Sequence, residues 1–237
     1  MFPYCNINGY KDSIFIINFA KIFLMKKLVI FDLDGTLLYS LEDLHNSLNF
    51  ALLHCGYAPR SLQQVNAAVG NGVGMLVRRS LPDTVSDAGF ERCYEVFKAH
   101  YAAHCCEKTR PYDGIPEMLK SLRDKGVKVG VLSNKFHSAA VEVVEHYFHG
   151  LYDIVLGESE IIGRKPSPDG VFAMLEAMDV DKADTVLFGD SDVDIITARN
   201  AGIDGVAVLW GFRDKDSLLA AGARNIIQNP SEVFLFV

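Results

Sequence analysis

Reactive side chains recur along this chain shortly after short apolar runs. They are Asp32 and Asp34 in the segment FDLDGT, Ser133 and Asn134 in VLSNK, Lys165 in GRKPSP, and Asp190 and Asp194 in GDSDVD. Apolar runs of this kind are typical of strands in a parallel sheet, and ligands bind beyond the carboxyl ends of such strands. The sequence therefore predicts that these side chains meet at one edge of a sheet and form a single site.

The aspartates of this set predict a metal site. Each close pair of carboxylates costs about 4 kcal/mol at an effective dielectric constant of about 20, and a divalent cation removes that cost. Carboxylates, a backbone carbonyl and water suit Mg²⁺, which retains several waters and also binds substrate phosphate. Because the whole chain is acidic, with a formal net charge of -7, this cation and Lys165 would supply the positive charge that a phosphorylated substrate needs.

The remaining polar groups predict phosphate chemistry. A hard cation, a lysine, a hydroxyl and free backbone amides at Gly35 and Thr36 together make a phosphate-binding site. One carboxylate is then free to attack phosphorus, and an aspartyl-phosphate intermediate is an established form of covalent catalysis. Asp34 lies two residues from Asp32 and projects to the same side of the strand. It is therefore placed to protonate the leaving oxygen and later to activate a water molecule.

Strands and helices alternate over most of the chain. Continuous apolar runs predict buried strands at 28–31, 127–132, 154–156, 186–188 and 205–209. Apolar residues at helical spacing lie between these runs, at 115–125, 139–148, 171–178 and 192–201. This alternation predicts an α/β fold with a doubly wound parallel sheet, Rossmann-like in its layout.

The alternation fails between residues 40 and 109, where the pattern is helical throughout. The expected helices span 41–55, 61–69, 72–81 and 86–106. We therefore predict a core made of residues 25–39 and 110–237, with residues 40–109 inserted as an all-helical domain. The glycine-rich segment 69–74 lacks the spacing of a nucleotide-binding loop and predicts a turn between two helices. Arg78 and Arg79, just beyond it, are expected to be solvated, with contact between one of them and a substrate carboxylate as the alternative.

The first 24 residues differ from the rest of the chain. The apolar run from residue 14 to residue 25 is broken by Asn18 and Lys21, and it is shorter than the roughly 20 residues that a membrane-spanning helix needs. No small-residue cleavage site of a signal peptide follows it. We expect residues 1–24 to lie outside the fold and Met25 to be the biological start.

Composition excludes several classes of partner. No stretch concentrates lysine and arginine, so neither nucleic acid nor an anionic membrane is expected as a partner. The five cysteines show no CxxC pair and no zinc-ligand spacing. Free thiols of this kind are typical of the reducing cytoplasm. We expect a cytoplasmic monomer or homodimer that acts on a small phosphorylated metabolite.

The motifs together resemble the haloacid dehalogenase (HAD) superfamily of phosphatases, in the branch that carries a helical cap after the first strand. The segment FDLDGT at 31–36 resembles its first motif, and Ser133 in VLSNK the second. Lys165 in GRKPSP resembles the third motif, and GDSDVD at 189–194 the fourth. The likeness extends from Lys26 to about Pro230, and these motifs occur in the expected order.

This resemblance implies a role for each motif residue. Asp32 would be the nucleophile and a Mg²⁺ ligand, and Asp34 the acid/base, with its backbone carbonyl on the metal. Ser133 and Lys165 would hold the phosphoryl group, with Asn134, Gly35 and Thr36 beside them. Asp190 would bind Mg²⁺, and Asp194 would support the metal site directly or through water.

Within the superfamily the chain is most similar to phosphoglycolate phosphatases, which makes phosphoglycolate the first expected substrate. The supporting segments are VGNGVG in the cap, GDSDVDI, and Trp210-Gly211. Tyr39 stands where that family commonly has aspartate. Pyrophosphatase and phosphosugar mutase activities remain alternatives, and so does a phospho-receiver signalling domain. A receiver domain, however, needs neither the second aspartate of DxDGT nor a helical cap.

Overall fold

The structure is a computed structural model that describes residues 26–237. The predicted extension at 1–24 and the predicted start at Met25 lie outside the described residues.

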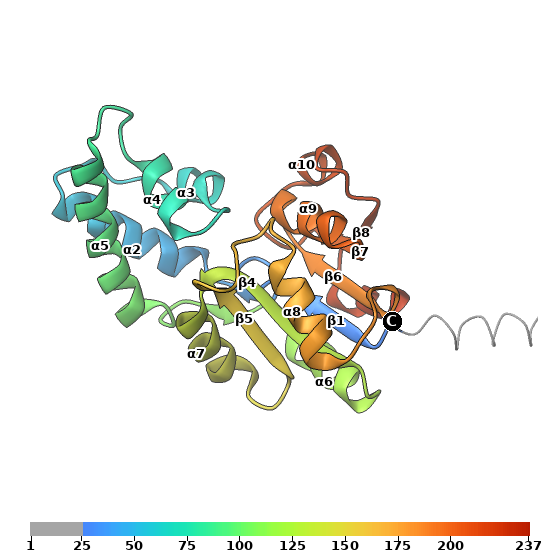
Figure 1. Ribbon diagram of the computed structural model, residues 1–237. Helices are drawn as coiled ribbons and strands as arrows, with labels where there is room; N and C mark the ends of the chain where they lie inside the picture. Colours follow the sequence, from blue (N-terminus) through green and yellow to red (C-terminus); the bar gives the residue numbers. More distant parts are fainter. Residues whose placement is uncertain (1–25) are drawn as a thin grey trace, which may run out of the picture.

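The core of the described chain is a six-stranded parallel sheet (Figure 1). Its strands, in spatial order, are β5 (Ile154–Glu158), β4 (Lys128–Phe136), β1 (Leu28–Phe31), β6 (Thr185–Gly189), β7 (Asp204–Val208) and β8 (Asn225–Ile227). The chain leaves β1 towards β4 on one side and returns to β6 on the other. This reversal of strand order next to β1 is the place where ligands bind in open α/β sheets, and it confirms the predicted doubly wound fold.

Alternating side chains of the strands build a core on each face of the sheet. In β1, Val29 and Phe31 pack into the cluster under α6 (Ile115–Asp124) and α7 (His137–Phe148). Leu28 and Ile30 pack into the opposite cluster, under α8 (Asp169–Met178) and α9 (Asp192–Ala201). All four side chains of β1 are fully buried, as expected for a strand covered by helices on both faces. The motif residues that follow β1 therefore stand on a rigid base.

A second group of helices lies to one side of the sheet (Figure 1). These helices are α2 (Leu41–His54), α3 (Leu62–Ala68), α4 (Val73–Ser80) and α5 (Asp87–His104). They enclose a separate apolar cluster that includes Leu48, Leu52 and Phe97. We refer to residues 41–104 as the cap. The predicted domain limits at 40 and 109 stay predictions; they fall beside a short antiparallel ribbon of β2 (Leu38–Tyr39) and β3 (Arg110–Pro111).

Several elements depart from the sequence prediction. The sheet has a further edge strand, β8, and the ribbon β2–β3 and the short helix α10 (Lys215–Ala220) were not predicted. Strand β4 was predicted to end at Leu132, but it continues to Phe136 with an irregular register against β5. Ser133 and Asn134 therefore lie within the strand rather than after it. Within residues 26–237, no helix combines the length and the apolar character needed to cross a membrane.

Candidate active site

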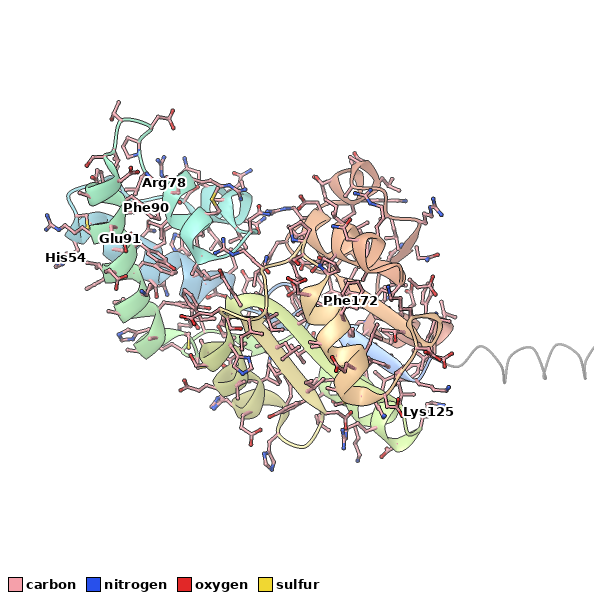
Figure 2. The ribbon with its side chains drawn as sticks, in the orientation of Figure 1. His54, Arg78, Phe90, Glu91, Lys125 and Phe172 are labelled. Atoms are coloured by element: carbon pink, nitrogen blue, oxygen red, sulfur yellow. The ribbon has the colours of Figure 1, made fainter. Side chains whose placement is uncertain are left out.

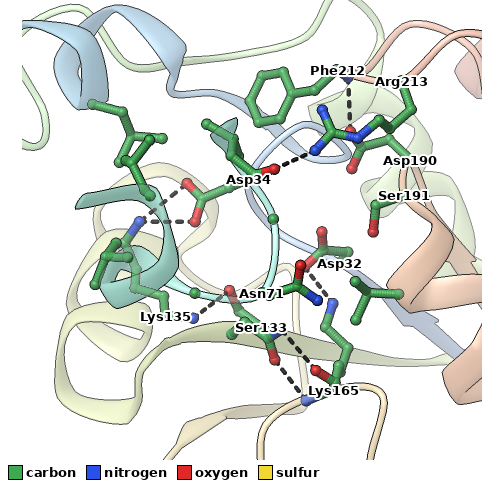
Figure 3. A pocket seen from close by; sticks show the side chains of 18 residues that line it. Asp32, Asp34, Asn71, Ser133, Lys135, Lys165, Asp190, Ser191, Phe212 and Arg213 are labelled. Carbon is green, nitrogen blue, oxygen red and sulfur yellow. Dashed lines mark hydrogen bonds and ion pairs between the residues drawn. The ribbon is translucent and has the colours of Figure 1, made fainter. Parts of the chain in front are cut away.

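A pocket lies at the carboxyl end of β1, between the core and the cap (Figure 3). Its cavity volume is about 80 Å³. The predicted site residues that line it are Asp32, Asp34, Ser133, Asn134, Lys165 and Asp190. The cap contributes Leu44, Leu76 and the segment from Val69 to Val73. The structure thus gathers predicted site residues that are up to 158 positions apart, Asp32 and Asp190, into one pocket.

Three carboxylates cluster at this site; two of them, Asp32 and Asp190, line the pocket, and Asp194 does not. Oxygen atoms of Asp32, Asp190 and Asp194 lie within 4.8 Å of one another, and all three residues are buried. Burial raises the pKa of Asp32 well above its usual range; the Lys165 ammonium opposes the rise, and the charges of Asp194 and Asp190 add to it. Burial, followed by the charge of Asp194, raises the pKa of Asp190 to about 7. The trio therefore accepts full negative charge only with cationic help.

Lys165 provides part of that help. Its Nζ donates to Asp32 Oδ1 at 2.7 Å and to Asp194 Oδ1 at 2.6 Å, and its side chain is 3% exposed. Burial alone would lower the pKa of this amine, but Asp194 and Asp32 outweigh that effect and raise it. Because the amine stays charged, it is a fixed cation beside the Asp32 carboxylate.

The loop after β7 holds Asp190 in place. The backbone amide of Phe212 donates to Asp190 Oδ2 at 2.7 Å, and Thr36 Oγ1 donates to Oδ1 at 3.2 Å. Trp210 Nε1 in turn donates to the carbonyl of Thr36 at 2.9 Å. At Gly211, a Cβ atom would lie 2.2 Å from the Asp190 Cβ, so only glycine fits there. Sequence reasoning singled out Trp210-Gly211 without assigning it this supporting task.

Asp34 has a different set of neighbours. Both of its carboxylate oxygens accept from Lys135 Nζ, at 3.1 and 2.9 Å, and the same nitrogen donates to the hydroxyl of Tyr101 at 2.9 Å. Lys135 lies on β4 and Tyr101 on α5 of the cap. Sequence reasoning missed both residues. The alternation of β4 places Lys135 on the same side as Ser133, which was the available signal for the lysine; nothing local pointed to Tyr101.

The predicted phosphate-binding residues divide into two groups. Ser133 lines the pocket, where its Oγ accepts from the Lys135 amide at 3.1 Å. The side chain of Asn134 instead forms two hydrogen bonds with the backbone of Lys165: it accepts from the amide at 2.7 Å and donates to the carbonyl at 3.1 Å. Asn134 therefore positions the loop that carries Lys165. Its contact with phosphate stays a prediction.

The structure corrects the prediction that the backbone amides of Gly35 and Thr36 are free to bind phosphate. The amide of Gly35 donates to the carbonyl of Leu38 at 2.8 Å, and that of Thr36 to the carbonyl of Leu33 at 3.3 Å. The turn after Asp34 closes on itself, so these amides are already engaged. Neither residue lines the pocket. Thr36 instead supports the site through its hydroxyl, which donates to Asp190 Oδ1.

The glycine-rich segment of the cap closes over the pocket. Gly70, Asn71 and Gly72 line it, and both glycines have positive φ angles that other residues rarely adopt. Two core arginines donate to the carbonyls of this region, Arg164 to Asn71 and Arg213 to Asn66 and Val69. The core and the cap are therefore in direct contact around the site.

The two cap arginines singled out from the sequence do not line the pocket. Arg79 donates to the carbonyl of Ala68 and to the side chain of Asn71, so it supports the glycine-rich turn. Arg78 stacks on Phe90 at 3.9 Å from the ring centre, within the cap and away from the sheet (Figure 2). Arg78 also forms an ion pair with the exposed Asp87.

The acidic trio suits a hard divalent cation. Lys165 is the lysine bonded to this trio, so full ionisation leaves excess negative charge. Asp32 Oδ2 has no hydrogen-bond donor among residues 26–237 and is free to coordinate. Oxygen ligands of this kind are those that Mg²⁺ prefers. Asp194 is different, since its oxygens already accept from Lys165 and from the amide and hydroxyl of Ser191. Its place in a metal site would be indirect.

Comparison with known proteins supports the family resemblance seen in the sequence. A family model described as haloacid dehalogenase-like hydrolase matches residues 29–208. The phosphoglycolate phosphatase of Aquifex aeolicus is 32% identical over 187 residues, 78% of this chain and 86% of that protein. That of Agrobacterium fabrum is 33% identical over 198 residues, 80% of this chain and 83% of that protein.

A solved structure from Lactobacillus delbrueckii subsp. bulgaricus, named provisionally as a phosphoglycolate phosphatase, superposes with a TM-score of 0.84. It is 36% identical in sequence and covers 88% of this chain and 97% of its own. The chain belongs to the haloacid dehalogenase-like hydrolase family. Within that family it is a phosphoric monoester hydrolase, as the sequence predicted.

Proposed function

We propose that this protein is a Mg²⁺-dependent phosphatase that hydrolyses a small phosphomonoester through an aspartyl-phosphate on Asp32, with phosphoglycolate as the first substrate to test. The observation that supports it best is the placement of Asp32: its carboxylate shares a pocket with Asp34 and Asp190 and accepts from the buried ammonium of Lys165. The names of the relatives support the choice of phosphoglycolate, and the small cavity suits a small substrate.

The residues would act in two steps. In the first, an oxygen of Asp32 attacks phosphorus, the bond from phosphorus to the leaving oxygen breaks, and Asp34 gives that oxygen a proton. In the second, water attacks the phosphorus of the aspartyl-phosphate while Asp34 takes a proton from it. The bond to Asp32 then breaks and inorganic phosphate is released. Lys165 and Ser133 would hold the phosphoryl oxygens throughout.

Metal binding would fall to the side chains of Asp32 and Asp190 and the backbone carbonyl of Asp34, with Asp194 holding Lys165 beside them. When bound, Mg²⁺ supplies charge stabilisation for the phosphoryl oxygens. The phospho-receiver alternative is set aside because the family is one of hydrolases. The cytoplasmic location and the monomeric or homodimeric state stay predictions.

A phosphate-release panel over small phosphomonoesters, with Mg²⁺ and with EDTA, tests the proposal. We expect turnover of phosphoglycolate that EDTA abolishes, and a loss of at least about 10³-fold in Asp32→Asn, since the nucleophile is removed. Asp34→Asn should lose about 10²- to 10⁴-fold, the usual contribution of acid/base catalysis. Full activity in EDTA, or in Asp32→Asn, would overturn the mechanism. Pyrophosphate and sugar phosphates belong in the panel, because preference for either would support the alternative activities.

A further inference from the structure

Lys135 is a buried charge for which the two-step scheme gives no task. It lies on β4, is 6% exposed, and lines the pocket at the junction of core and cap (Figure 3). A buried ammonium is stable only with partners close to it. Its partners are Asp34, from the turn after β1, and Tyr101, from α5 of the cap. Lys135 therefore connects the proposed acid/base to the part of the protein that closes the pocket.

The hydrogen bonds of Lys135 are directed at two residues, Asp34 and Tyr101. An ammonium group has three donors. Nζ has three acceptors around it: the two oxygens of Asp34, at 3.1 and 2.9 Å, and the hydroxyl of Tyr101, at 2.9 Å. Its hydrogen bonds in this structure are thus to the proposed acid/base and to the cap. This arrangement favours an action through Asp34 over a direct contact with the substrate.

We propose that Lys135 is a positioning residue for Asp34, and that its bond to Tyr101 makes this positioning depend on docking of the cap. The inference rests on the proposed function, in which Asp34 is the acid/base. Bonds to both carboxylate oxygens fix the rotation of the Asp34 side chain, and misplacement of a catalytic group by about 1 Å can cost about 10²-fold in rate. Tyr101 completes the shell of Lys135 only where α5 lies against β4.

The consequence is a site that is complete only when the pocket is closed. With the cap displaced, Lys135 would exchange the Tyr101 hydroxyl for water, and the ammonium that orients Asp34 would be held less tightly. Acid/base chemistry would then be restricted to the closed state, from which bulk water is excluded. Such coupling would favour reaction of a substrate over which the cap can close.

The first test compares Lys135→Met and Tyr101→Phe with two matched controls. Lys98→Met removes a lysine of the same helix as Tyr101, one that pairs with Glu95, and Tyr57→Phe removes a cap hydroxyl that does not contact Lys135. We expect kcat to fall roughly 10- to 100-fold in Lys135→Met and about 3- to 10-fold in Tyr101→Phe. KM and the inhibition constant of inorganic phosphate should stay within about twofold, and the controls should behave as wild type.

The second test is a double-mutant cycle with Asp34→Asn, using 4-nitrophenyl phosphate so that residual rates are measurable. If Lys135 acts through Asp34, Lys135→Met should cost little once Asp34 is already changed. If the fold-losses in kcat of the two single variants multiply in the double variant, the inference is overturned. A raised KM with unchanged kcat in Lys135→Met would also overturn it, because it would indicate contact with the substrate. If Lys135→Met does not fold, Tyr101→Phe in the same cycle gives the answer.

The two proposals fail in different ways. A wild-type protein that releases no phosphate from any monoester would overturn both. If Asp32→Asn abolishes turnover as expected but the cycle is additive, the proposed function stands and only the role of Lys135 is lost.

Discussion

The pocket contains two buried lysines that differ in what they join. Lys165 bonds Asp32 and Asp194, which both belong to the core, so this half of the site is complete without the cap. Lys135 bonds Asp34 in the core and Tyr101 in the cap, so the other half is complete only where the two parts meet. Under the proposed function, phosphoryl binding and nucleophilic attack would depend on the core alone, and proton transfer would depend on the core and the cap together.

The largest expected effect is on the half of the site formed by Lys165, Asp32, Asp190 and Asp194, which we call the core half. Lys165→Met would leave Asp32 and Asp194 buried without their cation, and breaking a buried ion pair from one side costs about 3–5 kcal/mol. Loss of the cation at the phosphoryl group should lower kcat/KM by at least about 10²- to 10³-fold. We expect a lower Tm by thermal denaturation and a larger loss of activity than in Lys135→Met. Equal losses in the two variants would remove the distinction between the halves.

An intermediate effect should appear in the response of the core half to pH. The pKa of Asp190 is raised to about 7, whereas an aspartate in an unfolded chain titrates near 3.9. The folded protein therefore binds more protons between these values, and the contribution of Asp190 to stability is lost as pH rises from about 4 to about 7. Mg²⁺ competes with that proton, so it should raise the Tm more at pH 8 than at pH 5.5.

Asp190→Asn is the matched control for this experiment, because amide and carboxylate have nearly the same shape. The variant should show a weaker dependence of Tm on pH between about 4 and about 7 without metal. Its Mg²⁺-induced rise in Tm should be small at both pH values. A rise that is equal at pH 5.5 and pH 8 in the wild type would contradict the assignment of Asp190 as a metal ligand.

The same division explains what could be predicted from the sequence. The core half was predictable because each of its residues follows an apolar strand in a recognisable segment, and strand ends of a parallel sheet meet at one edge. Lys135, on β4, was missed because its importance depends on Tyr101, which belongs to the cap helix α5 and lies 34 residues upstream. The amides of Gly35 and Thr36 were predicted wrongly because the closed turn that engages them is not visible in the spacing of motif residues. The edge strand β8 was missed because it is short and only partly buried.

The smallest expected effect on catalysis concerns a second set of hydrogen bonds, those accepted by Asp43 at the edge of the cap. Asp43, at the start of α2, is buried and accepts from the amides of Lys108 and Thr109 and from the Thr109 hydroxyl, at 2.8 to 3.0 Å. Asp43→Asn should weaken these charge-assisted bonds and lower the free energy of unfolding by about 1–3 kcal/mol. Because these hydrogen bonds do not involve Asp34, kcat should stay within about twofold of wild type at a temperature where the protein is folded. Phosphate release measures kcat, and denaturant unfolding measures the change in stability. A loss of kcat as large as in Tyr101→Phe would mean that any loosening of the cap slows the reaction, and that Tyr101 has no special place in it.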